Sequence, residues 1–346
     1  MTIGIVINRV MPLDSPGNAI KPKPSLMIAE PRQMNAHENT RPAEMVDALN
    51  AVFGKHQAAR SSHAKGVCAS GEFTPSTDAP QWVRSSLFAH GGVPAVLRFS
   101  VGGGNPNVSD KSRTVRGLSV HLNDSAQAYD LMMISEPVFF AATPASFVAF
   151  LQARVADPAT KKPDPNNIKA YEASFPDGKL QPRLLASHPA PASYATTAYF
   201  STHAFRFVNG RGEGVWGRLV MEPVAGTVLL SEEQEASLPD AFLAAELDAR
   251  LQTGTVQFRL YIQPAGPNDS LVDPSQQWSE NHSARLELGR LSVQAVEADT
   301  LCNPGVFDPM RLPDGIEPSD DPVLLSRSAA YSVSLQRRQV PGEATC

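Results

Sequence analysis

Two short segments near opposite ends of the chain carry residues suited to proton transfer and to metal binding. The first has an arginine, Arg60, followed three residues later by a histidine, His63, just before the small residues around Gly66. The second has an arginine, Arg327, followed four residues later by a tyrosine, Tyr331. Neither pair is specific by itself, but together they offer an acid–base group and an oxygen ligand for a metal ion.

The tyrosine could bind ferric iron if its phenol lost a proton. A phenol has a pKa of about 10 in water, and an adjacent guanidinium stabilises the phenolate by charge and by hydrogen bonding. Residues four apart lie on one face of a helix, so Arg327 and Tyr331 would be neighbours there. Tyrosinate is an uncommon but known haem ligand. On spacing alone, an ordinary half-buried tyrosine beside a solvated arginine is the more frequent explanation.

The histidine is equally ambiguous when taken alone. A single histidine near Ser62 and Ser100 is more often a hydrogen-bonded core residue than a catalyst. In a catalytic role, His63 would take a proton from one oxygen of a peroxide and deliver it to the other. Its second ring nitrogen would then need a partner, which a serine hydroxyl can supply. Together the two segments suggest a buried haem with His63 on one side and Tyr331 on the other.

Composition excludes several classes of protein. The 346 residues are 42% hydrophobic and 19% charged, which is an ordinary globular balance. A net charge of -5 argues against nucleic acid as a main partner, and no apolar stretch approaches the length of a membrane span. The N-terminal residues 1–10 lack the apolar core of a signal peptide. Three cysteines without a CxxC motif predict neither a disulfide framework nor a zinc site, and they favour a cytoplasmic protein.

Hydrophobic periodicity predicts one β-rich domain with helices outside it. Residues 1–40 contain five prolines without periodicity and are expected to form an N-terminal arm, residues 41–340 a single domain, and residues 341–346 a tail. Helices are expected at 42 to about 54, 143–155, 164–175, 240–253 and 322–338, and strands at 95–101, 114–122, 130–134, 202–208, 214–221, 256–263 and 285–293. A proline-rich connection is expected up to Pro191. Asn209-Gly210 predicts a hairpin. Short strands at regular spacing indicate an antiparallel sheet or barrel.

A series of short motifs resembles the haem catalase family. In order along the chain, they are His63-Ala64-Lys65-Gly66, Leu97-Arg98-Phe99-Ser100, Arg116-Gly117, Asp130-Leu131, Pro137-Val138-Phe139-Phe140 and Arg327–Tyr331. The match spans roughly residues 45 to 340. Because the chain lacks the long wrapping extensions and the C-terminal flavodoxin-like domain of larger catalases, it resembles the small catalase-related peroxidases. The resemblance implies an α+β fold whose core is an antiparallel β-barrel of the catalase type with surrounding helices.

The resemblance also implies a role for each matched residue. His63 would be the distal histidine, with Ser100 hydrogen-bonded to it and Ser62 before it, and Tyr331 would bind the iron with Arg327 as its charge partner. The cofactor would be haem b, since no CxxCH motif for covalent attachment is present. The remaining matched residues would form the haem pocket: Arg60, Arg98 and Arg338 at the propionates, Phe147 on the distal face, and Phe139 and Phe140 in the wall of the access channel. Buried carboxylates need fixed cations, which supports the arginine assignments.

Three positions depart from the family pattern. Catalases have an asparagine three residues before the proline of Pro137–Phe140, and Ile134 stands here. Ser62 replaces a valine before the histidine, and Thr114 replaces the channel aspartate. Ile134 and Thr114 stand where the family has polar or charged groups that handle hydrogen peroxide, whereas Ser62 adds a hydroxyl that could compete for the His63 imidazole. All three changes weaken the machinery for dismutation of hydrogen peroxide. They leave the iron ligand and the acid–base group in place.

These residues together predict a haem-dependent peroxidase with weak or no catalase activity. It would reduce hydrogen peroxide or organic hydroperoxides with a small organic electron donor. One alternative is a hydroperoxide isomerase of the allene oxide synthase type, with which Ser62 and the apolar Ile134 are compatible. Another is a non-enzymatic protein that stores or senses haem. The composition allows a homodimer.

Overall fold

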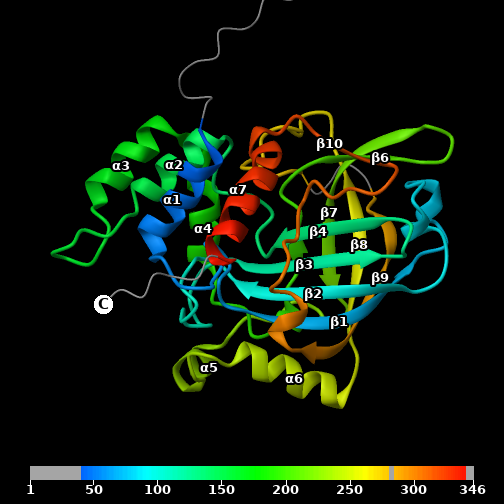
Figure 1. Cartoon of the computed structure of the whole chain (residues 1–346), viewed down its shortest axis with the longest axis horizontal. Helices are drawn as coiled ribbons and strands as arrows, with labels where there is room; N and C mark the ends of the chain where they lie inside the picture. Colours follow the sequence, from blue (N-terminus) through cyan, green and yellow to red (C-terminus); the bar gives the residue numbers. More distant parts are fainter. Residues whose placement is uncertain (1–39, 280–283, 340–346) are drawn as a thin grey trace, which may run out of the picture. The chain divides into compact units, whose positions relative to one another are not determined.

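Eight antiparallel strands close into a barrel in the computed structural model of the chain (Figure 1). The structure describes residues 40–279 and 284–339, so the expected arm, the tail and the N-terminal residues 1–10 lie outside it, apart from residue 40. Around the barrel the strand order is β7-β5-β4-β3-β2-β1-β9-β8, and pairing of β7 with β8 closes the ring. Strands β10 and β6 extend the sheet beside β7. The predicted antiparallel barrel is confirmed.

The strands and helices have the following bounds. The strands are β1 Gly66–Pro75, β2 Val93–Val101, β3 Arg116–Asn123, β4 Ala128–Ile134, β5 Tyr199–Phe200, β6 Phe205–Val208, β7 Gly214–Pro223, β8 Val256–Pro264, β9 Leu286–Glu297 and β10 Ile316–Pro318. The helices are α1 Pro42–Phe53, α2 Pro144–Gln152, α3 Pro165–Ser174, α4 Leu180–Ser187, α5 Glu232–Ser237, α6 Leu243–Thr253 and α7 Pro322–Gln339.

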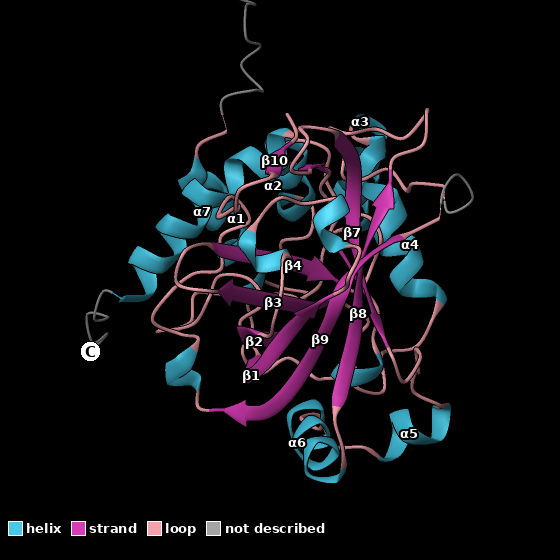
Figure 2. Cartoon of the chain, turned by 90° about the vertical axis from the view of Figure 1, so that its right-hand side faces the viewer, coloured by secondary structure: helices cyan, strands magenta, loops and turns pink. Residues whose placement is uncertain are grey.

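The helices gather in two places. Helix α1 packs against α2 and α7, and these three lie beside the barrel together with α3 and α4 (Figure 1). Helices α5 and α6 lie apart from that group, near one end of β8 and β9 (Figure 2). The site residues predicted from the sequence fall on α2 and α7 of this first group, on strand β2, and on the loops that follow α1 and β4.

Along the central strands, side chains point alternately into the barrel core and toward the outer face that meets the helices. In β2, Leu97 and Phe99 are fully buried in the barrel interior, where the Phe99 ring stacks on Tyr194 at 5.3 Å between centroids. Each such burial contributes roughly 1.5–3 kcal/mol. Successive strand residues point to opposite faces, so Arg98 and Ser100 project outward. The same pleat that fills the core therefore supplies polar groups to the outer face.

Most predicted elements are present, but the sequence did not indicate strand β1 or helix α4. Helix α4 occupies part of the proline-rich stretch expected to be a connection. Its proline, Pro182, lies in the first helical turn, where a backbone N–H has no intrahelical partner to lose. The helix expected to reach Val155 ends at Gln152. The very short elements α5, β5 and β10 were also missed, because two to six residues carry too little periodicity.

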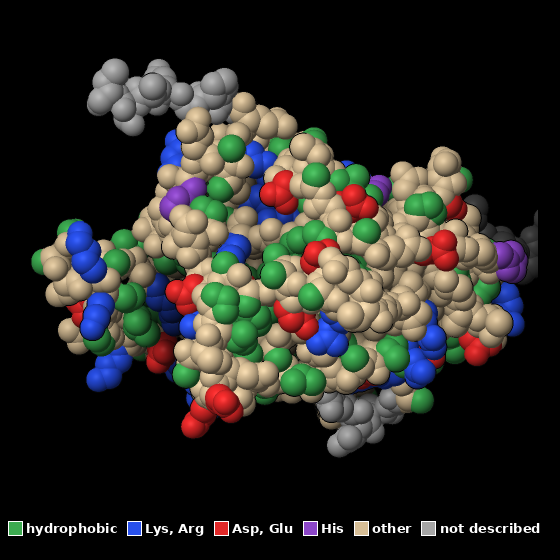
Figure 3. Space-filling model, turned by 90° about the horizontal axis from the view of Figure 1, so that it is seen from below, with side chains coloured by type: hydrophobic (Ala, Val, Ile, Leu, Met, Phe, Trp, Pro, Cys, Tyr) green, Lys and Arg blue, Asp and Glu red, His purple; other side chains and the backbone are tan. Residues whose placement is uncertain are grey.

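Two surface properties bear on possible partners. No helix in the described ranges is both long and apolar enough to cross a membrane. On the face shown in Figure 3, positive and negative side chains are interspersed among polar and apolar ones. This face presents no extended patch of one sign of charge.

Candidate functional site

A cavity of about 540 Å³ lies between the outer face of β2–β4 and helices α1, α2 and α7. Every site residue predicted from the sequence lines it: Arg60, Ser62, His63, Arg98, Ser100, Phe139, Phe140, Phe147, Arg327, Tyr331 and Arg338. The cavity brings together segments that are more than 260 residues apart in the chain.

His63 is held on the barrel side of this cavity by a serine and a glycine. Its Nδ1 lies 2.9 Å from the Ser100 hydroxyl oxygen on β2. Across the sheet Ser100 pairs with Gly117 on β3, and Gly117 pairs with Ile134 on β4. A Cβ at Gly117 would lie 2.8 Å from His63 Nδ1, so only glycine leaves room for the ring. His63 itself has a φ of 53°, a left-handed conformation that is uncommon outside glycine and often marks a functional position.

The environment of His63 keeps its imidazole neutral. Burial is the main cause, and the positive charges of Arg98 and Arg327 add to it, so the pKa of His63 falls from 6.5 to about 3. A neutral imidazole has one nitrogen that donates a hydrogen bond and one that accepts a proton. If Nδ1–H donates to Ser100, Nε2 is free to accept a proton in the cavity.

Tyr331 projects from α7 on a face that it shares with Arg327. The Nε of Arg327 donates to the phenolic oxygen at 2.8 Å, and Nη2 donates to the same oxygen. Two guanidinium donors on one phenolic oxygen are suited to stabilising a phenolate. The spacing expected from the sequence therefore gives direct contact between the two side chains.

A third residue, His203, connects Arg327 to a buried carboxylate. Arg327 Nη1 donates to His203 Nε2 at 2.8 Å, and His203 Nδ1 lies 2.6 Å from Asp321. Burial lowers the pKa of His203, although Asp321 acts in the opposite direction, and a neutral ring is what Arg327 requires as an acceptor. Asp321 also caps α7 by accepting from the backbone N–H of Val323 at 2.8 Å.

The sequence did not indicate that His203 would lie beside the predicted site residues. It is one of eight histidines in the chain, and no motif in the sequence links it to Arg327 or Tyr331. It lies 118 residues from Asp321 and 124 from Arg327. Asp321 directly precedes the predicted helix at 322–338, which is the position of an N-cap, and it does cap that helix.

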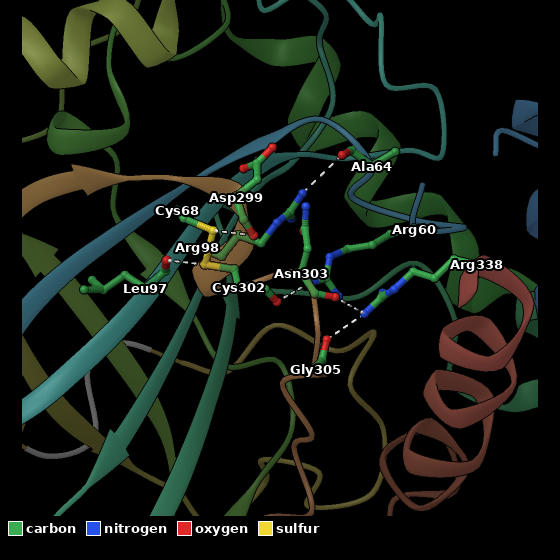
Figure 4. Close-up of a disulfide and its surroundings, with 10 residues drawn as sticks. All are labelled: Arg60, Ala64, Cys68, Leu97, Arg98, Asp299, Cys302, Asn303, Gly305 and Arg338. Carbon is green, nitrogen blue, oxygen red and sulfur yellow. Dashed lines mark hydrogen bonds between the residues drawn. A yellow bond between two sulfur atoms is a disulfide. The ribbon is translucent and has the colours of Figure 1, made fainter. Parts of the chain in front are cut away.

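Three arginines lie together at another edge of the cavity, around residues 299–305 (Figure 4). Arg60 donates to the carbonyl oxygen of Cys302 at 2.9 Å, and Arg338 donates to that of Gly305 at 2.6 Å. Arg98 donates to the Ala64 carbonyl at 3.1 Å. Burial and the positive charges of Arg98 and Arg338 lower the pKa of Arg60 to about 9. Within the described ranges, no carboxylate forms an ion pair with any of the three.

A disulfide between Cys68 and Cys302 lies beside this arginine cluster (Figure 4). The expectation of no disulfide was wrong for this pair. Cys68 is on β1 and Cys302 follows a short helical turn, and their Cα atoms are 6.0 Å apart. The two are 234 residues apart in the chain, so their spacing in the sequence could not indicate that they meet.

Aromatic rings form the apolar wall of the cavity on the side of α2. The rings of Phe139 and Phe140 lie 4.4 Å apart between centroids, and Phe147 lies 5.1 Å from Phe140. Phe150 adds a fourth ring at 4.4 Å from Phe140. This wall could pack against the face of a flat apolar group.

The three residues that depart from the catalase pattern also line the cavity: Ser62, Thr114 and Ile134. Ile134 on β4 pairs with Gly117 on β3, and Gly117 lies against the His63 ring. Among the described residues, the hydrogen bond of the imidazole goes to Ser100, and Ser62 forms none with it. The predicted competition of Ser62 for the ring is therefore not seen.

Comparison with known proteins agrees with this geometry. The family model for catalase matches residues 41–342. The catalase-related peroxidase of Synechococcus elongatus is 34% identical over 300 residues, covering 86% of this chain and 88% of the relative. The catalase-related peroxidase of Mycolicibacterium paratuberculosis is 35% identical over 300 residues, covering 86% of this chain and 94% of the relative. A fungal catalase structure superposes with a TM-score of 0.74 at 22% identity, covering 83% of this chain and 61% of the catalase, and it supports the fold alone. This chain belongs to the catalase family.

Proposed function

We propose that this protein is a haem-dependent peroxidase that reduces hydrogen peroxide or organic hydroperoxides with a small organic electron donor, with weak or no catalase activity. The observation that carries the proposal is the presence of His63, its Ser100 partner and the Arg327–Tyr331 pair on the walls of one cavity. The names of the two catalase-related peroxidases support it. A cytoplasmic location and a homodimer stay predictions.

The residues around the cavity fit a haem b. Tyr331 offers an oxygen that already accepts two guanidinium hydrogen bonds. The arginine cluster of Arg60, Arg98 and Arg338 has crowded positive charges that two propionates would neutralise. The Nε of Arg60 is buried and has no partner among the described residues, which is a cost that a carboxylate would remove. Aromatic rings provide an apolar face for the porphyrin.

In this proposal Tyr331 would hold the iron, and the haem would supply the redox chemistry on peroxide. His63 performs the proton transfer. Its neutral Nε2 takes the proton from the peroxide oxygen that binds, and the resulting imidazolium returns it to the oxygen that leaves. With two electrons and two protons in all, a hydroperoxide gives one alcohol and one water. Ser100 keeps the ring in the orientation for both steps.

The apolar side chain of Ile134 accounts for the weak catalase activity. Dismutation requires a second hydrogen peroxide molecule to be bound and oriented as the reductant. Ile134 cannot donate or accept a hydrogen bond, so it gives this molecule no polar contact. An organic donor does not need that contact, and the peroxidase reaction is preserved.

The test compares the purified protein with Tyr331→Phe and His63→Gln variants, with Tyr261→Phe on β8 as a matched control outside the cavity. We expect a tyrosinate-type haem spectrum in the protein and in the control, and its loss in Tyr331→Phe. His63→Gln should retain haem and lose peroxidase turnover by roughly 10²-fold or more. Failure to bind haem, or full activity in His63→Gln, would overturn the proposal. Consumption of a fatty-acid hydroperoxide without any donor would instead indicate an isomerase.

A further inference from the structure

The cavity has an unusual balance of charge. Six arginines line it, and no aspartate or glutamate of the described residues does. The proposed haem site uses four of them, at the propionates and beside Tyr331. Two remain, Arg113 and Arg154, and the proposed function gives them no role.

Arg154 lies just beyond the C-terminal end of α2, against the aromatic wall. Its Nη1 donates to the Phe150 carbonyl at 3.0 Å, and its guanidinium carbon lies 3.5 Å from the centre of the Phe150 ring. The centre of the Tyr171 ring on α3 lies 5.4 Å from the same guanidinium carbon. Glu172 attracts Arg154 from a distance, but no described carboxylate forms an ion pair with it. The stacking fixes the guanidinium plane while leaving N–H groups unused.

Arg113 approaches the cavity from the loop before β3. Its Nη1 donates to the Ala186 carbonyl on α4 at 3.3 Å. It too has no ion pair with a described carboxylate. It precedes Thr114 and lies four residues before Gly117, which supports His63. Arg113 therefore lines the cavity from an exposed position beside α4.

A guanidinium binds a carboxylate through two parallel hydrogen bonds, and this is among the stronger polar contacts in proteins. Beside Arg154 the cavity offers phenylalanine rings, which suit an apolar organic body. The protein as a whole carries a net charge of -5, so attraction for an anion must come from groups inside the cavity.

We infer that Arg113 and Arg154 bind the carboxylate of an organic substrate, so that a carboxylate-bearing substrate reacts in preference to its neutral analogue. The inference rests on the proposed peroxidase function and names the substrate class for that site. The carboxylate could belong to the hydroperoxide or to the electron donor, since both must reach the haem through the cavity.

The experiment measures kcat/KM with matched pairs of substrates. One pair is a carboxylic acid hydroperoxide and its methyl ester, and the other is a phenolic acid donor and its methyl ester with hydrogen peroxide as oxidant. The enzymes are the haem-bound protein, Arg113→Gln, Arg154→Gln and the double variant. Arg183→Gln is the control, because it removes the same charge from an exposed position on α4 that does not line the cavity.

We expect the protein and the control to prefer the acid over the ester, and each cavity variant to lose this preference by roughly tenfold, as for a charged hydrogen bond. Activity on the ester should stay unchanged. A loss seen in only one substrate pair identifies whether the hydroperoxide or the donor carries the carboxylate.

Two results would overturn the inference. One is activity without any acid preference in either pair, which would leave the peroxidase proposal intact. The other is loss of haem from the double variant, which would mean that these arginines hold the propionates. Absence of turnover with every substrate would instead contradict the proposed function itself.

Discussion

The backbone of Gly117 lies against the imidazole of His63. A Cβ added at this position would be 2.8 Å from His63 Nδ1 and 2.5 Å from the Ser100 hydroxyl. Both distances are shorter than real Cβ atoms show. Glycine at this point of β3 therefore allows the histidine and the serine to form their hydrogen bond.

Replacing Gly117 by alanine should disturb proton transfer while leaving the haem ligand intact. The new methyl group must displace the His63 ring or the Ser100 hydroxyl, and a misplacement of about 1 Å can cost on the order of 10²-fold in rate. Peroxidase turnover should fall at least tenfold, while haem content is unchanged. Gly210→Ala is the control, because a Cβ there meets no atom within 4 Å. Wild-type turnover in Gly117→Ala would show that the contact is not needed.

Replacing His203 by leucine should alter the electronic state of the bound haem. The change removes the acceptor of Arg327 and leaves Asp321 with one partner fewer, at a cost of about 1–3 kcal/mol in the free energy of unfolding. His121→Leu is a matched control, since His121 also lies 2.6 Å from a buried carboxylate, Asp130, whereas Arg327 donates to His203.

We expect both histidine variants to be less stable, and only His203→Leu to shift the absorption spectrum of the haem-bound protein. His203→Gln should recover part of the wild-type spectrum, because its amide oxygen can accept from Arg327. Identical spectra in all of them would mean that His203 is purely structural.

An asparagine at position 134 should increase catalase activity. Ile134→Asn places an amide near His63, and one added hydrogen bond to hydrogen peroxide is worth about 0.5–1.5 kcal/mol, or roughly two- to tenfold in rate. Oxygen release from hydrogen peroxide is measured beside Ile134→Val, which keeps the apolar character and should change nothing. No gain of oxygen release in Ile134→Asn would contradict the proposal that Ile134 limits catalase activity.

Breaking the disulfide should loosen the haem. Cys302 precedes the carbonyl groups that position Arg338, and its own carbonyl accepts from Arg60. Cys68→Ser should lower the free energy of unfolding by roughly 2–4 kcal/mol and increase the rate at which haem passes to an acceptor protein. A reducing agent should have the same effect on the wild type and none on Cys68→Ser/Cys302→Ser. If the wild type in its native, oxidised form shows three titratable thiols after denaturation, the disulfide is absent.

The stability of the haem-free protein should decrease in acid through His63. Its pKa is 6.5 in the unfolded chain and about 3 in the folded one, so between these values the unfolded state binds the extra proton. Stability from this group is therefore present above pH 6.5 and is lost as the pH falls toward 3, by at most about 1.4 kcal/mol per pH unit. The free energy of unfolding of His63→Gln, measured with denaturant over this pH range, should depend less steeply on pH than that of the wild type. Parallel curves would mean that His63 titrates normally in the folded protein.

Much of this protein could be predicted from local sequence patterns. The alternation around Leu97 and Phe99 indicates a strand with a buried face, because successive strand residues point to opposite sides. The separation of Arg327 and Tyr331 brings them into contact because a helix turns once in 3.6 residues. These relationships depend on a few adjacent dihedral angles, so the sequence by itself determines them.

Contacts between distant segments were decided by the tertiary structure alone. Closure of the barrel and packing of α7 beside it bring His203 to Arg327 and Cys68 to Cys302, across 124 and 234 residues. The fit of Gly117 under His63 requires the register of β2 with β3, together with the turn that follows α1. Local sequence patterns do not determine such contacts. The intervening chain could follow many paths between the two segments, and only the packing of the whole core selects one.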